Sequence, residues 1–168
     1  ETLRCHVGCR TLLFLRVMTD QGIVGWSEYN ESFGSAGLSQ VIEALSATVI
    51  GKDPRQIELI NAHLRTVTVQ SRGGINRQAV AAIENALLDI KAKALGVPVY
   101  DLFGGAVRTR IPVYWSHCGS YRARYPELIG VPRVKSYDDL ARLGEEVRRR
   151  GFRALKTNVA LSDGKSLA

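Results

Sequence analysis

A short segment near the end of the chain carries a lysine and an amide at alternate positions. The segment Phe152 to Asn158 is predicted as a strand, in which side chains alternate between two faces, so Ala154, Lys156 and Asn158 share one face. A lysine in an apolar setting can have a lowered pKa, or it can offer positive charge to a carboxylate, whereas an amide cannot accept a proton. The alternative for Lys156 is a solvated lysine at the end of a surface strand.

A second polar pair closes the apolar segment Ile111 to Cys118, which is also predicted as a strand. Ser116 and His117 lie where this strand ends, and they are candidate contacts to a substrate. Because neighbouring side chains alternate, one of the two must point outward. For His117 the alternative is a packing or loop histidine.

The residues between these strands predict a helix. Ser136 and Asp139 match a capping box that opens it, and Gly151 ends it. Strand, helix and strand together form a βαβ unit with parallel strands. A parallel sheet is normally buried on both faces, so we expect the chain to continue into further βα units or to pair with something else. The stretch Leu161 to Ala168 carries no assignment, and the first residue is Glu1 rather than Met, so we expect a piece of a longer protein.

The first hundred residues are predicted to form strands followed by helices. Thr11 to Met18 and Ile23 to Ser27 form a hairpin around the turn Thr19 to Gly22. Polar loops are expected before it, from Arg4 to Arg10, and after it, from Tyr29 to Gly37. This order is typical of an α+β domain.

Apolar residues at helical spacing predict three helices, one stopped by Gly51, one opened by Asp53 and one over about Asn76 to Leu95. Asp53 is predicted to cap the second helix, Pro54 to take its first position and Gln56 to reach back to the cap. The residues expected on the buried stripes are Leu38, Val41, Ile42, Leu45, Val49, Ile57, Ile60, Leu64, Val67, Ala79, Ile83, Ala86, Leu87, Ile90 and Ala94.

The composition is that of a globular protein, with 168 residues, 45% of them hydrophobic and 23% charged. No apolar run approaches the roughly 20 residues needed to cross a bilayer, and we expect a cytoplasmic protein. The net charge is +7, and the most basic residues, Arg148, Arg149, Arg150 and Arg153, lie at the end of a predicted helix, where cations are favoured. A solvated helix end is therefore preferred to a nucleic-acid surface. Cys5, Cys9 and Cys118 lack the spacing of a zinc or redox site and are expected to be reduced.

The segment Ala79 to Gly105, AVAAIENALLDIKAKALGVPVYDLFGG, closely resembles the signature of the mandelate racemase and muconate lactonizing family of the enolase superfamily. The matching positions are Ala79, Ala82, Ile83, Glu84, Ala86, Leu87, Asp89, Ile90, Lys93, Pro98, Leu102 and Gly104. The segment GIVGWSE, Gly22 to Glu28, also resembles the family's first hairpin. Glu84 and Asp89 lie on different faces of the predicted helix, so we interpret them as packing or pairing residues rather than as a metal pair.

The resemblance implies an α+β capping domain, an antiparallel sheet plus helices, over residues 1–108. It implies that residues 109–168 are the start of a (β/α) TIM-type barrel, which is truncated. Active sites lie at the carboxyl ends of barrel strands, under loops of the capping domain. Lys156 and Asn158 would then be catalytic residues.

Substrate contacts are implied at four further positions. Ser116 and His117 end the first barrel strand, while Glu31 and Phe33 lie in a capping-domain loop that could close over the substrate. The alternative for this loop, which is rich in Gly and Ser, is a simple connection.

The chemistry that the resemblance implies is removal of the proton next to a carboxylate, with Mg²⁺ stabilising the enediolate. The family's three acidic ligands come from the third, fourth and fifth barrel strands. We therefore expect no metal ligand within this chain, and we expect this piece alone to be inactive. The expected partners are a small-molecule carboxylate substrate and further copies in a homo-oligomer, with no nucleic acid and no membrane.

The sequence departs from a common family pattern at one point. Many members carry Lys-x-Lys, the second lysine being a base, whereas this chain has Lys156, Thr157 and Asn158. Racemisation needs proton carriers on both faces of the substrate, but elimination of water needs one base and one acid. We therefore predict a lyase that dehydrates a sugar acid, an aldonate or aldarate, to a 2-keto-3-deoxy acid. The alternatives are a racemase, epimerase or cycloisomerase of the same family, or a non-catalytic fragment.

Overall fold

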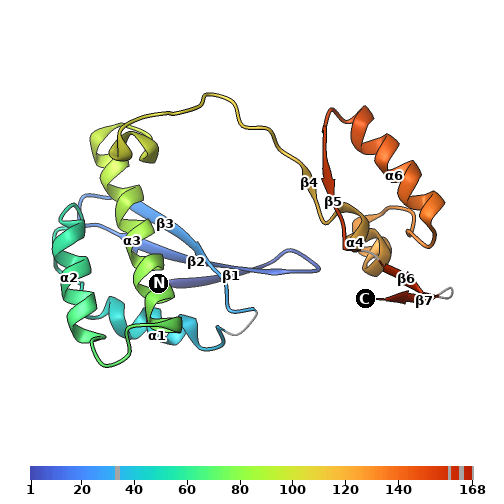
Figure 1. The fold of residues 1–168 in the computed structure, drawn as a ribbon. Coiled ribbons are helices and arrows are strands. Elements are labelled where there is room, and N and C mark those ends of the chain that lie inside the picture. The colour runs from blue at the N-terminus through green and yellow to red at the C-terminus, as the bar shows by residue number, and fades with distance from the viewer. Residues whose placement is uncertain (33–34, 159, 163–164, 168) are drawn as a thin grey trace. The chain divides into compact units, whose positions relative to one another are not determined.

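The protein is described here by a computed structural model, which covers residues 1–32, 35–158, 160–162 and 165–167, with side chains described up to Asn158. The chain divides into two compact units, Glu1–Val107 and Arg108–Ala168 (Figure 1). The elements of the first unit are β1 (Thr2–His6), β2 (Thr11–Met18), β3 (Val24–Tyr29), α1 (Leu38–Ser46), α2 (Ile57–Val67), α3 (Gly74–Leu95) and the 3₁₀ helix η1 (Val99–Phe103). Those of the second are β4 (Trp115–Ser116), α4 (Cys118–Arg124), α5 (Pro126–Ile129), α6 (Tyr137–Arg149), β5 (Leu155–Lys156), β6 (Ala160–Ser162) and β7 (Lys165–Leu167).

The first unit is built on a three-stranded antiparallel sheet in the order β1-β2-β3. The predicted hairpin of β2 and β3 is confirmed, although its second strand runs from Val24 to Tyr29. The predicted loop from Arg4 to Arg10 is wrong over Arg4 to His6, because Thr2–His6 pairs with β2 along its whole length, and only residues 7–10 form a loop. Arg4, Cys5 and His6 of this edge strand are exposed, and the sequence of the strand lacks the apolar alternation of a half-buried strand.

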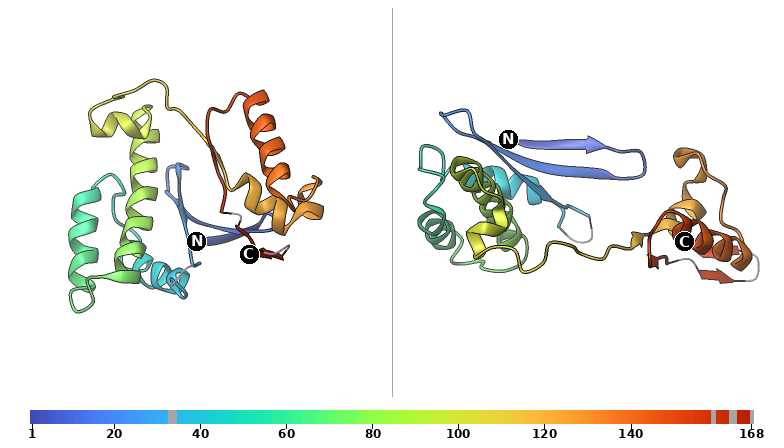
Figure 2. Two further views of the ribbon diagram at one scale, coloured as in Figure 1. Left: turned by 45° about the vertical axis from the view of Figure 1, so that its right-hand side comes forward. Right: turned by 90° about the horizontal axis from the view of Figure 1, so that it is seen from above.

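Helices α1, α2 and α3 form a second layer beside the sheet (Figure 2). The core between the layers consists of Leu13, Leu15, Tyr29, Leu38, Ile42, Leu45, Ile57, Ile60, Leu64, Ala79, Val80, Ala82, Ile83, Ala86, Leu87 and Ile90. Most of the predicted stripe positions are therefore confirmed. Val67 and Ala94 are exposed instead, since each lies in the last turn of its helix, beyond the contact with the sheet.

The start of α2 differs from the prediction. The helix begins at Ile57, and the Asp53 carboxylate accepts hydrogen bonds from the backbone N–H of Arg55 at 3.0 Å and from its guanidinium at 2.9 Å. An aspartate that bonds two residues ahead forms a local turn in place of a helix cap. The predicted roles of Asp53, Pro54 and Gln56 at the helix start are therefore wrong, and α1 likewise ends at Ser46, before Gly51.

Two side chains of α3 hold the free edge of β3. The Asp89 carboxylate accepts the backbone N–H of Trp26 at 2.8 Å, and Lys93 donates to the carbonyl of Val24 at 2.7 Å and to Asp89 at 2.6 Å. The interpretation of Asp89 as a pairing residue is confirmed. Between these contacts Gly25 touches the helix, and a Cβ at this position would stand 2.2 Å from the carbonyl oxygen of Ala86.

The second unit contains the predicted parallel pair, with β4 beside β5. Both strands are shorter than predicted: residues 111–114 and 152–154 lie outside strands, and Ile111 is exposed. A single βαβ unit offers each of its strands only one neighbour, so fewer residues are held by ladder bonds. The predicted extension of the first strand to Cys118 is wrong, because the chain turns at His117 into α4.

The predicted capping box of α6 is confirmed. The Ser136 hydroxyl accepts the backbone N–H of Asp139 at 3.2 Å, and the Asp139 carboxylate accepts the N–H of Ser136 at 2.9 Å. The helix ends at Arg149, and Gly151 follows with φ of 84°. Arg148 and Arg149 are exposed, as expected of a solvated helix end. In the part of the chain that the structure describes, no helix is long and apolar enough to span a membrane.

Candidate functional site

Two candidate residues lie side by side at the ends of the parallel strands. Ser116 of β4 is opposite Lys156 of β5 in the strand register, and Trp115 is opposite Leu155. Trp115 packs against the small core of the second unit, which includes residues of α6. Because side chains alternate along a strand, Ser116 and Lys156 point to the face away from α6. Both are exposed, so a hydroxyl and an ammonium group share one open face.

Asn158 lies just past the end of β5, and its backbone is held by the second unit. Its N–H donates to the hydroxyl of Ser120 at 2.9 Å. The preceding Thr157 packs against Gly119, and its hydroxyl oxygen is buried without a hydrogen-bond partner among the described residues. The Asn158 residue itself is exposed. The main chain at this position is therefore fixed, while the residue remains accessible.

His117 occupies an unusual backbone conformation. Its φ is 55°, in the left-handed region, and among the described residues it is the one non-glycine residue with positive φ. It precedes α4, and its ring lies 5.9 Å from that of Tyr121. The residue is half-buried. His117 therefore lies at the turn from β4 into α4, and its contact with a substrate stays a prediction.

A cluster that the sequence did not predict lies on the other face of β4. The Arg122 guanidinium donates to both carboxylate oxygens of Glu146, at 2.7 and 3.0 Å, and Arg150 pairs with the same carboxylate at 2.8 Å. The two guanidinium groups lie 5.6 and 5.0 Å from the ring centroid of Trp115. Hydrogen bonding from Arg122 is the main reason that the pKa of Glu146 is lowered. The spacing of Glu146 and Arg150 signals one pair, but nothing in the sequence indicates Arg122.

Glu31, a candidate residue of the first unit, makes contacts within that unit. The Glu31 carboxylate accepts the backbone N–H of Ser39 at 2.6 Å and pairs with Arg4 at 3.2 Å. The hydrogen bond from Ser39, near the start of α1, is the main cause of its lowered pKa. Glu31 thus holds the amino end of a helix. Phe33 lies outside the described residues.

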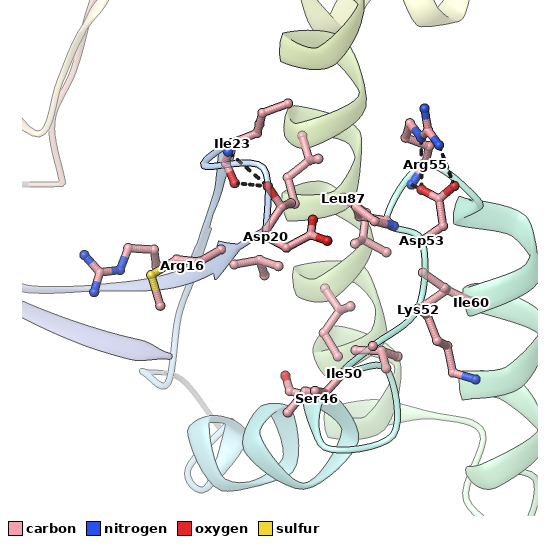
Figure 3. Close-up of a pocket in the computed structure, with 18 of the residues that line it drawn as sticks. Arg16, Asp20, Ile23, Ser46, Ile50, Lys52, Asp53, Arg55, Ile60 and Leu87 are labelled. Atoms are coloured by element: carbon pink, nitrogen blue, oxygen red, sulfur yellow. Dashed lines mark hydrogen bonds and ion pairs between the residues drawn. The ribbon is translucent and has the colours of Figure 1, made fainter.

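The first unit also contains an open hollow of about 790 Å³, lined by the β2–β3 turn, the loop between α1 and α2, and α3 (Figure 3). Ile60 and Leu87 contribute apolar lining, while Asp20, Lys52 and the Asp53–Arg55 pair supply charges of both signs. Across the described residues, no group of three or more His, Cys, Asp or Glu side chains could hold a metal ion. The side chains described here therefore do not fit a divalent metal site.

An antiparallel three-stranded sheet covered by helices matches the N-terminal capping domain of enolase superfamily members. The chain belongs to the mandelate racemase / muconate lactonizing enzyme family, whose N-terminal domain matches residues 3–104. It is 43% identical over 102 residues to a D-galactonate dehydratase of Xanthomonas axonopodis pv. citri (strain 306), and 41% identical to one of Variovorax paradoxus (strain S110). Each match covers 61% of this chain and 27% of the relative.

Solved structures resemble the chain over more of its length. A candidate L-alanine-DL-glutamate epimerase from Burkholderia xenovorans strain LB400 is 44% identical, with a TM-score of 0.91, and the match covers 100% of this chain and 42% of that one. The same protein has been solved with magnesium and fumarate. A candidate galactarate dehydratase from Agrobacterium radiobacter, bound to Na and L-malate, has 27% identity and a TM-score of 0.70 over 96% of this chain and 38% of its own.

Proposed function

We propose that this chain is part of a Mg²⁺-dependent lyase that dehydrates an aldonate or aldarate to a 2-keto-3-deoxy acid. In this proposal residues 1–108 form the capping domain and residues 109–168 form the start of a barrel. The observation that carries the proposal is the open face shared by Ser116 and Lys156, with Asn158 next to it. The galactonate dehydratase relatives, and the small carboxylates bound in the neighbouring structures, support the substrate class.

Lys156 would act through its charge. Its ammonium group would bind the substrate carboxylate and stabilise the negative charge that develops when the neighbouring proton is removed. Asn158 and Ser116 would donate hydrogen bonds to substrate oxygens, which orients the substrate. Since an amide cannot accept a proton, one of the two bases that racemisation requires is missing at this position.

Magnesium, when bound, supplies a Lewis acid for the enediolate. The described side chains offer no group of ligands for it, so in this proposal its ligands lie in parts of the whole protein outside this chain.

The test is an assay of the whole protein with Mg²⁺ against a set of aldonates and aldarates, D-galactonate and galactarate among them. We expect formation of a 2-keto-3-deoxy acid and its loss on chelation of the metal. Lys156→Met should lower kcat/KM by about a hundredfold or more, since one oriented charge contributes that much. Lys135→Met, a change at an exposed lysine of the same unit, is the matched control and should be nearly neutral.

A second candidate is an epimerase, favoured by the match to the Burkholderia protein over the full length of this chain. Reactions in D₂O separate the two. Exchange and inversion at the carbon next to the carboxylate, without loss of water, would replace the dehydratase proposal by this one. Asn158→Lys, which restores the two-lysine pattern, should then increase inversion.

A further inference from the structure

We propose that Ser120 is a positioning residue for the candidate site, acting through Asn158. Its hydroxyl accepts the N–H of Asn158 at 2.9 Å, so it fixes the main chain at the point where β5 ends. The inference rests on the proposed function insofar as Asn158 contacts a substrate. Ser120 itself is 9% exposed and is not among the residues on the open face.

The path of the chain brings Ser120 to this place. After β4, the left-handed conformation of His117 directs the chain straight into α4. The first three residues of this helix, Cys118, Gly119 and Ser120, are all buried. The first turn of α4 therefore lies against the end of β5, although Ser120 and Asn158 are 38 residues apart in the sequence.

Gly119 makes the approach possible. A Cβ at this position would stand 2.3 Å from the Thr157 hydroxyl oxygen, 3.1 Å from the Thr157 Cβ and 3.2 Å from a methyl group of Leu140. A side chain at this position would force the Thr157 hydroxyl to rotate away, and Thr157 and Leu140 would each have to shift by a few tenths of an ångström. Gly119 and Ser120 thus hold two successive residues, Thr157 and Asn158, from one side.

Helix α4 is also held by an ion pair to α6. Arg122, two residues after Ser120, is 9% exposed and makes two hydrogen bonds to Glu146 of α6. A charge-assisted pair with this geometry is among the stronger side-chain contacts. The helix therefore connects α6 to the end of β5, and the position of Asn158 depends on it.

The contact is tested first in the whole protein by amide hydrogen exchange measured by NMR. Ser120→Ala removes the acceptor, so the Asn158 amide should exchange about tenfold faster, as expected for loss of one hydrogen bond. Amides of α6 should be unchanged. Ser46→Ala, a matched change in the first unit, should leave the Asn158 amide as it was. If the exchange rate of the Asn158 amide is the same in Ser120→Ala as in the wild type, the inference is overturned, whatever reaction the whole protein performs.

The second test uses the whole protein and a double-mutant cycle with Asn158→Ala. Ser120→Ala should lower kcat about tenfold, because misplaced substrate contacts reduce the rate, and Ser120→Thr, which keeps the oxygen, should recover part of it. In the Asn158→Ala background, Ser120→Ala should cause no further loss. Equal losses in both backgrounds would show that Ser120 does not act through Asn158. Absence of dehydration in the wild-type protein would count against the proposed function, and the exchange experiment would still decide the positioning role.

Discussion

The two units of the chain are stabilised in different ways. Among the described residues, the first unit buries sixteen core residues between a sheet and its helices, and the core of the second consists of Cys118, Val134, Leu143 and Val147. The charges are divided as well. Residues 1–107 carry ten basic and ten acidic side chains, whereas residues 108–168 carry thirteen basic and six acidic ones, so the whole net charge of +7 belongs to the second unit.

The first unit therefore has most of the buried apolar core, whereas the second carries the candidate site. The first unit has the larger apolar core and carries no net charge, which suits a domain that folds on its own. The second unit relies on hydrogen-bonded arginines around one tryptophan, and it leaves the face of Ser116 and Lys156 open. An excess of positive charge attracts carboxylates from a distance, so the charge distribution agrees with the proposed substrate class.

The largest effect should come from the close contact in the first unit. Gly25→Ala would place a Cβ 2.2 Å from a backbone oxygen of α3, which cannot move without shifting the helix. We expect a loss of about 3 kcal/mol in the free energy of unfolding, the upper range for overpacking. The indole N–H signals of Trp26 and Trp115 report the two units separately in urea titrations by NMR. The Trp26 signal alone should shift its midpoint, while Gly144→Ala, where a Cβ meets no atom within 4 Å, should not destabilise either unit.

Arg122→Met should have the opposite effect, because it should destabilise the second unit and leave the first unchanged. This change leaves Glu146 without its two short hydrogen bonds, and we expect the second unit to lose about 2 kcal/mol. The Trp115 signal should move to lower urea and the Trp26 signal should stay. Arg124→Met removes an exposed arginine from the same helix and is the control. Equal effects of the two changes would mean that the cluster contributes only net charge.

A smaller effect in the second unit is expected from Ser136→Ala. The change removes the side-chain acceptor at the start of α6, which typically costs about 1 kcal/mol. Circular dichroism and the Trp115 signal should show the loss. Ser136→Thr keeps a hydroxyl at the cap, so it should be close to the wild-type protein.

The smallest effect should be a loss of stability of the second unit at acidic pH. Hydrogen bonds, first of all from the backbone N–H of Lys135, lower the pKa of Asp139 from 3.8 to about 2. A carboxyl group whose pKa is lowered by folding stabilises the protein above its unfolded pKa, and this contribution is lost as the pH falls through the folded value. The Trp115 midpoint should therefore decrease between about pH 4 and pH 2. In Asp139→Asn this part of the pH dependence should be absent; a decrease of the same size in that variant would assign it to other carboxyl groups.

The sequence predicted those elements whose signals are local. The hairpin around Gly22, the long helix α3 and the capping box of Ser136 and Asp139 all follow from periodicity or from contacts between near neighbours. β1 was missed because an exposed edge strand shows no apolar alternation. The turn at Asp53 was mistaken for a helix cap because aspartate forms both, and the choice depends on the backbone.

The candidate site was predictable only in part. The register that places Ser116 beside Lys156 agrees with the parallel pairing expected of a βαβ unit. The contacts of Ser120 and Arg122 join residues 38 and 24 positions apart, and no local pattern indicates such pairs. The roles of Lys156, Asn158, Ser116 and His117 in catalysis or binding stay predictions.

The pair of side chains from α3 at the edge of β3 has a consequence for self-association. Asp89 and Lys93 occupy one outward N–H and one outward carbonyl of that strand, as a fourth strand would. A second polypeptide therefore cannot add to the sheet there by backbone pairing without first displacing both. Within this three-stranded sheet, the border that remains open to backbone pairing with another strand is the one at β1.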